Sequence, residues 1–308
     1  MRVAIPALAL CALAAWGAAG EKASPPPPVF PVGLDLVNLT VTVRDAEGNL
    51  VPNLKAEDFT VLEDGHAQTL QVFAPAVEPG QAETLALDLG LLMDTSESML
   101  NEMRLSQEAA VRFLEAIPRA RDLMTIFFDQ DIRISRYDSE HQQGLFSRIL
   151  EMKGSGNTAL YDAIAVYLSR VQNASGRRVL VLFTDGDDTT SALSLPEIIQ
   201  LVRSSTVTIY SIAFTGSLPS GSSQGLSARA FLRHIADLSG GEVFTPFSSK
   251  DLDGIYDKIL AELTAQYVLG YVSDNTHRDG KFRKLKVEVR PKGMKVRYRG
   301  GYYAPKDG

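Results

Sequence analysis

The sequence predicts a doubly wound α/β domain with a mostly parallel sheet, accompanied by a small β-sandwich. In residues 84–264, near-continuous apolar runs alternate with segments of helical spacing, which is typical of parallel strands covered on both faces by helices. In residues 34–73 and 267–303, apolar and polar residues alternate with a period of two. Each flanking segment is too short to bury a face alone, and an inserted domain usually has its ends close together. We therefore expect the two flanks to pack together as one sandwich.

Within the α/β segment, the first strand is expected at residues 85–93, and a helix follows until Pro118 stops it. The strands expected at 123–128 and 132–137 are separated by too few residues for a crossover, which predicts an antiparallel hairpin. The fourth strand, at 179–183, is again wholly apolar. The other elements expected here are helices at 141–152, 160–171, 195–203, 228–238 and 251–264, and strands at 207–214 and 242–245.

The flanking segments are expected to hold short strands separated by turn residues such as Asp64-Gly65 and Asp279-Gly280. The strands expected in the flanks lie at residues 36–43, 59–63, 68–73, 267–272, 282–290 and 294–303. The predicted organisation is a signal peptide at 1–20, a Pro-rich linker at 21–33, an N-terminal β module at 34–83, the α/β domain at 84–264 and a C-terminal β segment at 265–304.

The N-terminus has the pattern of a secretory signal peptide. Arg2 is followed by an apolar run over residues 3–15 and then by small residues. The run is shorter than the ~20 residues that span a bilayer, and no other stretch qualifies, so we expect no transmembrane segment in the mature chain. We therefore expect an exported protein, either periplasmic or secreted to the cell surface. Removal of Cys11, the one cysteine, would leave no disulfide, so the stability would come from packing.

The charge of the chain narrows the choice of partners. Its formal net charge is −6, which argues against nucleic acid as the main partner because phosphate binding needs clustered Lys and Arg. Basic residues do gather between Lys281 and Arg299, where they alternate with apolar residues. This alternation indicates a solvated strand face; a patch for a membrane surface or a polyanion is the alternative.

Two of the apolar strands end in aspartates that a core does not accommodate. The first strand ends at Asp94, and the fourth ends immediately before Asp185. In open α/β sheets, ligands bind beyond the carboxyl ends of strands, where the strand order reverses. If these two strands are neighbours at that point, the two carboxylates face each other, and they repel unless they are protonated or bridged by a cation. The sequence therefore predicts a cation site at this edge.

Neutral oxygens complete the predicted site. Ser96, Ser98 and Thr158 can supply hydroxyl groups, and no His or Cys is close in the sequence. Such hard oxygen ligands suit Mg²⁺, with Mn²⁺ or Ca²⁺ as alternatives, and do not suit zinc. Few anionic ligands would leave the ion with residual positive charge and with a bound water. An acidic side chain of a protein partner could replace that water, so the sequence predicts a binding module and not an enzyme.

Three motifs in order resemble the metal-ion-dependent adhesion site of von Willebrand factor type A (VWA) domains. They are D-x-S-x-S at 94–98, G-N-T at 156–158 and T-D-G at 184–186. The resemblance implies a Rossmann-like fold over residues 84–264 and a role in adhesion or assembly. The flanking segments are similar to those of the VWFA-related family of secreted bacterial proteins.

The same resemblance implies a role for each site residue. Ser96 and Ser98 would ligate the cation directly, and Thr158 would do so directly or through water. Asp94 and Asp185 would act mainly through waters and hydrogen bonds.

One departure from the family pattern concerns charge. Glu97 stands between the two serines, where a small residue is usual. Together with Asp187 and Asp188, it makes the rim of the site more negative. This would strengthen cation capture and weaken the attraction for an acidic partner.

Simpler roles and other functions are the alternatives. Helix caps would account for Asp94, the two serines and Thr158, and a turn would account for Asp185. Asp162 is either a group behind the ligands or an exposed helical residue. A metal-dependent hydrolase or phosphatase with Asp94 as nucleophile is a second function, but such sites usually carry another Asp where Ser96 stands. A structural protein with a vestigial site is the third.

Overall fold

The computed structural model describes residues 36–77, 87–117, 120–137, 142–171, 177–214 and 222–306, all within one compact unit. The predicted signal peptide and linker lie outside the described residues, so those predictions remain untested. No helix in the described ranges is long and apolar enough to cross a membrane.

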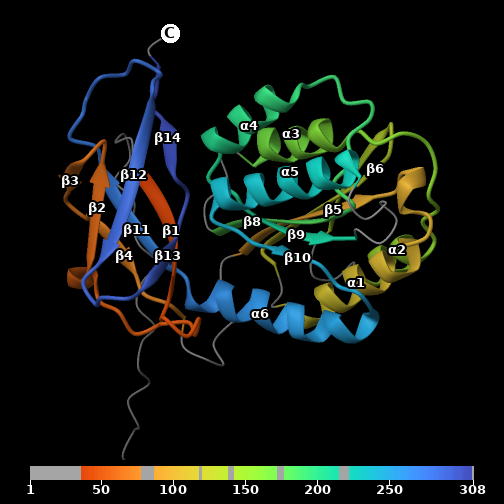
Figure 1. Ribbon diagram of the computed structural model, residues 1–308, viewed down its shortest axis with the longest axis horizontal. Helices are drawn as coiled ribbons and strands as arrows, with labels where there is room; N and C mark the ends of the chain where they lie inside the picture. The colour runs from red at the N-terminus through yellow and green to blue at the C-terminus, as the bar shows by residue number, and fades with distance from the viewer. Residues whose placement is uncertain are drawn as a thin grey trace, which may run out of the picture. The chain divides into compact units, whose positions relative to one another are not determined.

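A six-stranded sheet forms the centre of the α/β segment, with the order β10-β9-β8-β5-β6-β7 (Figure 1). Its neighbours pair in parallel except β6 and β7, which form the predicted antiparallel hairpin. The doubly wound, mostly parallel sheet is thus confirmed. The strands are β5 (Leu87–Asp94), β6 (Asp122–Phe128), β7 (Ile132–Tyr137), β8 (Arg177–Thr184), β9 (Thr208–Ala213) and β10 (Val243–Phe244).

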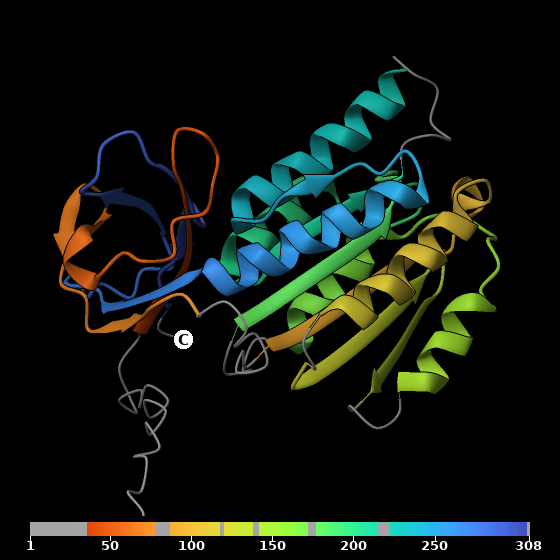
Figure 2. The same ribbon diagram turned by 90° about the horizontal axis from the view of Figure 1, so that it is seen from below.

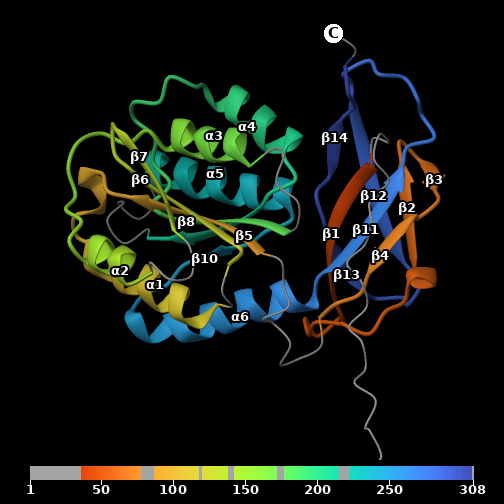
Figure 3. The same cartoon turned by 180° about the vertical axis from the view of Figure 1, so that it is seen from behind.

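Helices cover both faces of this sheet. Figures 1 and 3, drawn from opposite sides, show α3, α4 and α5 on one face and α1, α2 and α6 on the other. All eight residues of β5 are buried, as expected for a strand covered from both sides. The helices are α1 (Met103–Ala116), α2 (Gln142–Leu150), α3 (Leu160–Arg170), α4 (Leu195–Ser204), α5 (Ser223–Ser239) and α6 (Leu252–Ala265).

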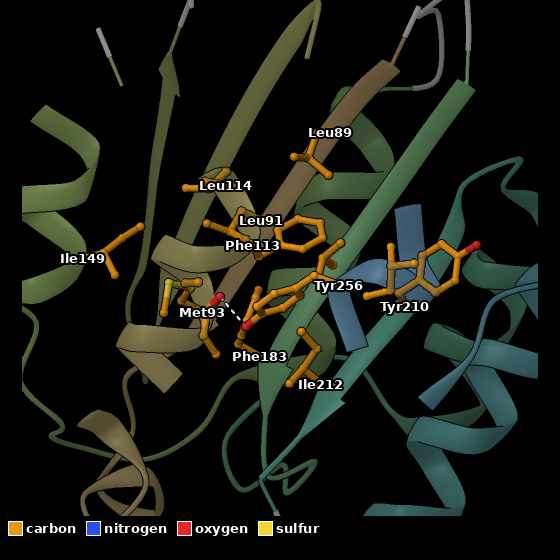
Figure 4. Packing of buried hydrophobic residues seen from close by; sticks show 14 of the residues in the cluster. Leu89, Leu91, Met93, Phe113, Leu114, Ile149, Phe183, Tyr210, Ile212 and Tyr256 are labelled. Carbon is orange, nitrogen blue, oxygen red and sulfur yellow. Dashed lines mark hydrogen bonds between the residues drawn. The ribbon is translucent and has the colours of Figure 1, made fainter. Parts of the chain in front are cut away.

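Two apolar clusters lie on the two faces. On the α1 side, Leu91 and Met93 of β5 pack with Phe113 and Tyr256 (Figure 4), whose ring centroids are 5.7 Å apart. On the other side, Leu92 of β5 belongs to the cluster that includes residues of α3, α4 and α5. Alternate residues of β5 therefore pack against opposite helical layers, so both faces of the strand are covered up to its last residue, Asp94.

The flanking segments form two four-stranded sheets, with the orders β13-β1-β11-β4 and β14-β12-β2-β3. Each sheet mixes strands from both ends of the chain: β1 pairs antiparallel with β11, and β12 pairs antiparallel with β2. Their inward side chains share one apolar cluster, as the sequence predicts. The strands are β1 (Leu36–Arg44), β2 (Phe59–Glu63), β3 (His66–Gln68), β4 (Val72–Ala74), β11 (Tyr267–Val272), β12 (Phe282–Val289), β13 (Lys295–Arg297) and β14 (Gly301–Tyr303).

Two expected strands are divided in the structure. Residues 294–303 form β13 and β14, and residues 68–73 are shared between β3 and β4, so each expected strand contributes to both sheets. Strands that change sheet at a corner are common in sandwiches. The period-two pattern does not reveal the change, because the inner faces of both sheets point into the same core.

The prediction of a solvated basic face is wrong for two residues. Arg283 and Arg299 have exposed fractions of only 3% and 8%. The guanidinium of Arg283 pairs with Glu63 of β2, which is also buried, at 3.1 Å. Arg283 therefore belongs to the sandwich interior, whereas Arg299 reaches the carbonyl of Ser205 in the α/β segment at 3.5 Å.

Helix α6 joins the α/β segment to the flanking sheets. It leads into β11 through a single residue, Gln266 (Figure 2). Its Glu262 is completely buried, and its carboxylate pairs with Arg44 of β1 at 2.6 Å and with Arg297 of β13. Tyr210 of β9 donates a hydrogen bond to the same carboxylate at 3.0 Å. A charged group this deep is stable only because two cations and a hydroxyl surround it.

Candidate metal site

The sheet topology brings the two predicted strand ends together. β5 and β8 are neighbours in parallel register, with Met93 opposite Phe183, so their carboxyl ends reach the same edge. From β5 the chain continues to β6 on one side and later to β8 on the other, which makes this the point where the strand order reverses. The Thr184 hydroxyl donates a hydrogen bond to Asp94 Oδ2 at 2.6 Å. Asp94 and Asp185 are both completely buried.

The hydroxyls of Ser96 and Ser98 form a short chain of contacts that begins at Asp94. Ser96 Oγ donates to Asp94 Oδ1 at 2.6 Å, and the Ser96 backbone N–H donates to the same oxygen at 3.0 Å. Ser96 Oγ also lies 3.0 Å from Ser98 Oγ. A short 3₁₀ helix, Glu97–Met99, begins here, but the Ser96 side chain does not cap it. The capping role does not account for Ser96, whose hydroxyl is used inside the site.

Backbone hydrogen bonds hold the Thr158 loop against the first motif. Ser155 N–H donates to Thr95 O at 2.9 Å, and Glu97 N–H donates to Gly156 O at 3.0 Å. Thr158 is buried, yet Ala159 is the N-cap of α3, and the first-turn N–H groups of Tyr161 and Asp162 donate to the side chains of Asp188 and Ser191. The capping role proposed for Thr158 is therefore wrong. The approach of its hydroxyl to the two aspartates remains a prediction.

The third motif needs its glycine. Gly186 has a φ of +88°, and a Cβ there would lie 2.8 Å from Leu232 Cδ1. Its N–H donates to the Thr184 hydroxyl at 3.0 Å, which aims that hydroxyl at Asp94. This contribution of Thr184 was not predicted from the sequence, although a lone hydroxyl at the end of a wholly apolar run is a visible signal.

Burial raises the pKa values of both aspartates. The pKa of Asp94 rises to about 7, mainly because the carboxyl is buried and secondly because Asp185 is close; hydrogen bonds from Ser96 and Thr184 oppose the rise. Burial also raises the pKa of Asp185, against the opposing hydrogen bond from the Asp187 N–H. Asp185 Oδ2 is buried and has no hydrogen-bond partner among the described residues. Two adjacent carboxylates with an unsatisfied oxygen form an arrangement that a cation would stabilise.

The chemistry of these oxygens fits a hard divalent cation. In the described part of the chain, no cluster of three or more His, Cys, Asp or Glu side chains is placed to hold a metal. The site instead combines two carboxylates with the hydroxyls of Ser96 and Ser98, and the Ser98 hydroxyl is near enough to Asp185 to lower its pKa. Oxygen-only coordination of this kind suits Mg²⁺, Mn²⁺ or Ca²⁺.

The acidic residues around the site differ in their contacts. Glu97 is exposed and makes the rim more negative, as the sequence predicts. Asp187 accepts a hydrogen bond from Gln224 at 2.6 Å, and Asp188 accepts one from the backbone of Tyr161 at 3.1 Å. Both are thus engaged in packing the loop after β8 against its neighbours.

Asp162 has a structural role in the same region. Its carboxylate accepts hydrogen bonds from the backbone N–H groups of Ala192 and Leu193, at 2.8 and 3.0 Å. It therefore ties the loop after β8 to the start of α3.

Comparison with known proteins gives one family. Residues 88–258 match the sequence profile of the von Willebrand factor type A domain, which is more than half of the chain. No curated protein matches the chain significantly.

The solved structures that match the chain have low sequence identity to it. A von Willebrand factor type A protein from Catenulispora acidiphila is 12% identical, with a TM-score of 0.49 over 90% of this chain and 75% of that one. BatB from Bacteroides thetaiotaomicron, described as a conserved hypothetical protein, is 13% identical, with a TM-score of 0.44 over 56% and 97%. Proximal thread matrix protein 1 from the mussel byssus, with a zinc-occupied MIDAS motif, is 18% identical, with a TM-score of 0.46 over 64% and 48%. At these values nothing about the site follows from them.

Proposed function

Because the chain belongs to the von Willebrand factor type A domain family, we propose that it binds a divalent cation, Mg²⁺ first, and through it an acidic side chain of a protein partner. VWA domains typically mediate protein interactions, and the finer assignment rests on one observation. Asp94 and Asp185 are buried side by side, with an oxygen of Asp185 left without a partner and with two serine hydroxyls adjacent. The predicted signal peptide leads us to propose that the site operates outside the cytoplasm.

In this proposal the hydroxyl oxygens bind the ion, and the aspartates orient those hydroxyls. Ser96 gives its one hydroxyl proton to Asp94 Oδ1, so its lone pairs are free to face a cation. Ser98 and Thr158 would supply further oxygens, and Asp185 would contribute through its unsatisfied Oδ2. The cation, when bound, supplies residual positive charge that attracts a carboxylate from outside. The predicted chemistry is therefore recognition, without bond cleavage.

The contacts of Asp94 argue against the alternative of a phosphatase. A nucleophilic carboxylate needs an oxygen that can reach the substrate. Asp94 is completely buried, and each of its oxygens accepts at least one hydrogen bond from Ser96 or Thr184. Ser96 also stands where such enzymes usually carry their second Asp. We expect no turnover of a panel of phosphoesters in the presence of Mg²⁺, and turnover abolished by Asp94→Asn would overturn this assignment.

Calorimetric titration with Mg²⁺ and Mn²⁺ tests the proposed function. We expect saturable heats for the wild-type protein and none for Asp94→Ala, because the substitution removes the acceptor that orients Ser96 and one of the two negative charges. Asp253→Ala is the matched control, since that carboxylate is 75% exposed on α6 and pairs with Arg112 of α1. Circular dichroism establishes that each variant is folded. Equal heats in all three proteins would contradict the proposed metal site.

A further inference from the structure

A small basic pocket lies directly beside the candidate metal site. Its volume is about 160 Å³, and it is lined by Thr95, Phe127, Arg133, Arg148, Met152 and Lys153. Thr95 stands between Asp94 and Ser96 in the chain, so the wall of the pocket is continuous with the first motif. Lys153 immediately precedes the loop that carries Thr158. The pocket and the metal site therefore share the carboxyl-end edge of the sheet.

One of the three cations in the pocket is neutralised. Arg133 pairs with Asp129 at 2.7 Å and also donates to the Thr95 hydroxyl at 2.9 Å. The pair fixes the guanidinium against the end of β5. Asp129 is thereby the counter-charge of Arg133 and leaves the other two cations uncompensated.

The other two cations have no acidic partner among the described residues. Arg148 donates to the neutral Ser135 hydroxyl at 2.9 Å and lies over the ring of Phe127, 5.2 Å from its centroid. Lys153 is exposed, and no described carboxylate pairs with it. The pocket thus presents two positive charges and several N–H donors that no anion of the described residues satisfies. Charge-assisted hydrogen bonds from such donors are the usual way in which proteins hold oxyanions.

We propose that this pocket is a second subsite for the same partner. One carboxylate of an acidic segment of the partner would complete the metal site, and a second carboxylate of that segment would bind in the pocket. The inference rests on the proposed function and deepens it. The partner is an acidic protein segment with two carboxylates, because the pocket is contiguous with a site that attracts one carboxylate and has room for another. The positive charges of Arg148 and Lys153 would also offset the negative charge of exposed Glu97, which by itself would repel such a partner.

An exposed apolar side chain lies beside the loop that leads from Lys153 to Thr158. Leu100 is 54% exposed, and its Cδ2 lies 3.0 Å from where a Cβ on Gly154 would be, next to Lys153. A side chain at residue 154 would crowd Leu100, so the glycine lets the leucine contact the loop. The segment between the two acidic residues of the partner would contact this leucine.

Two kinds of probe test the pocket. Sulfate is titrated in EDTA, so that no metal takes part, and the backbone amide signals of residues 95 and 153 are followed by NMR. Synthetic peptides with one acidic residue, or with two at varied spacing, are titrated in Mg²⁺. The variant is Arg148→Gln/Lys153→Gln, and its control, Arg233→Gln/Lys258→Gln, removes the same charge from exposed positions on α5 and α6. Both are expected to retain Mg²⁺ binding.

We expect the best two-acid peptide to bind the wild-type protein and the control about tenfold more tightly than the one-acid peptide, as one added charge-assisted contact allows. In the pocket variant this advantage should disappear, and the sulfate-induced shifts should disappear with it. If Mg²⁺ binds but the two-acid peptide has no advantage, or has one that the pocket variant keeps, the inference is wrong while the metal site stands. Sulfate binding without any peptide discrimination would assign the pocket to a small inorganic anion and overturn the inference. Failure of Mg²⁺ itself to bind would count against the proposed function.

Discussion

Substitution of Asp94 with asparagine is expected to raise the unfolding free energy of the metal-free protein at pH 8 by about 4 kcal/mol. Burial and the neighbouring Asp185 raise the pKa of Asp94 from 3.8 to about 7 in the folded state. Because the folded pKa lies above the unfolded one, the protonated carboxyl contributes stability that is fully present below pH 3.8 and is lost as the pH rises through about 7. The difference between the two pKa values corresponds to about 4 kcal/mol. Asparagine has the same shape and no such loss.

Urea unfolding between pH 5 and pH 8 in EDTA measures this effect. The wild-type protein should lose stability across that range, whereas Asp94→Asn should change less; Asp253→Asn, at an exposed position, should follow the wild type. Addition of Mg²⁺ at pH 8 should reduce the difference, since only the wild type gains stability from the ion. Parallel pH profiles for the wild type and Asp94→Asn would mean that the carboxyl is ionised in the metal-free fold and that the two aspartates do not repel.

The second large effect is expected in the sandwich, for Arg283→Met. The buried carboxylate of Glu63 accepts hydrogen bonds from the hydroxyls of Tyr271, Ser273 and Tyr302, at 2.6 to 2.8 Å, and pairs with Arg283 at 3.1 Å. Burial raises the pKa of Glu63, but the hydroxyls and Arg283 together hold it below its usual value. Removal of the cation leaves a buried charge without a counter-charge, so we expect a loss of about 3–5 kcal/mol in unfolding free energy.

Lys286→Met is the matched control for this prediction. Lys286 lies on the same strand, is 65% exposed and pairs with Glu288 at the surface. Its substitution is expected to change the unfolding free energy by less than about 1 kcal/mol. In the double variant Glu63→Gln/Arg283→Met, part of the loss should be recovered because the orphaned charge is gone. A loss for Arg283→Met no larger than that of the control would show that the ion pair contributes little to holding the two flanks together.

The position of the candidate site was predictable from the sequence because two local signals coincide. Wholly apolar runs identify strands covered on both faces, and an aspartate at the end of such a run is costly unless it serves a ligand. Asp94 and Asp185 both show this pattern. The parallel arrangement of such strands then places the carboxyl ends at one edge, which the structure confirms for β5 and β8.

The buried charges of the flanks were not predictable in the same way. Glu63 and Arg283 are 220 residues apart in the chain, and an arginine within a period-two pattern looks the same whether it faces solvent or a buried carboxylate. The division of residues 294–303 between two sheets was not predictable for a related reason. Strands of both sheets show the same alternation of apolar and polar residues. The basic pocket combines residues from several elements, so no single stretch of sequence predicts it.

Crystals grown in saturating Mn²⁺, with anomalous diffraction recorded at the manganese edge, test the central claim most directly. The claim is that two neighbouring strand ends deliver carboxylate and hydroxyl oxygens to one cation. We predict a single strong anomalous peak beside Asp94 and Asp185, at about 2.0–2.3 Å from the hydroxyl oxygens of Ser96 and Ser98, as expected for a hard divalent ion. A peak at another place, or none at this edge of the sheet, would contradict the account.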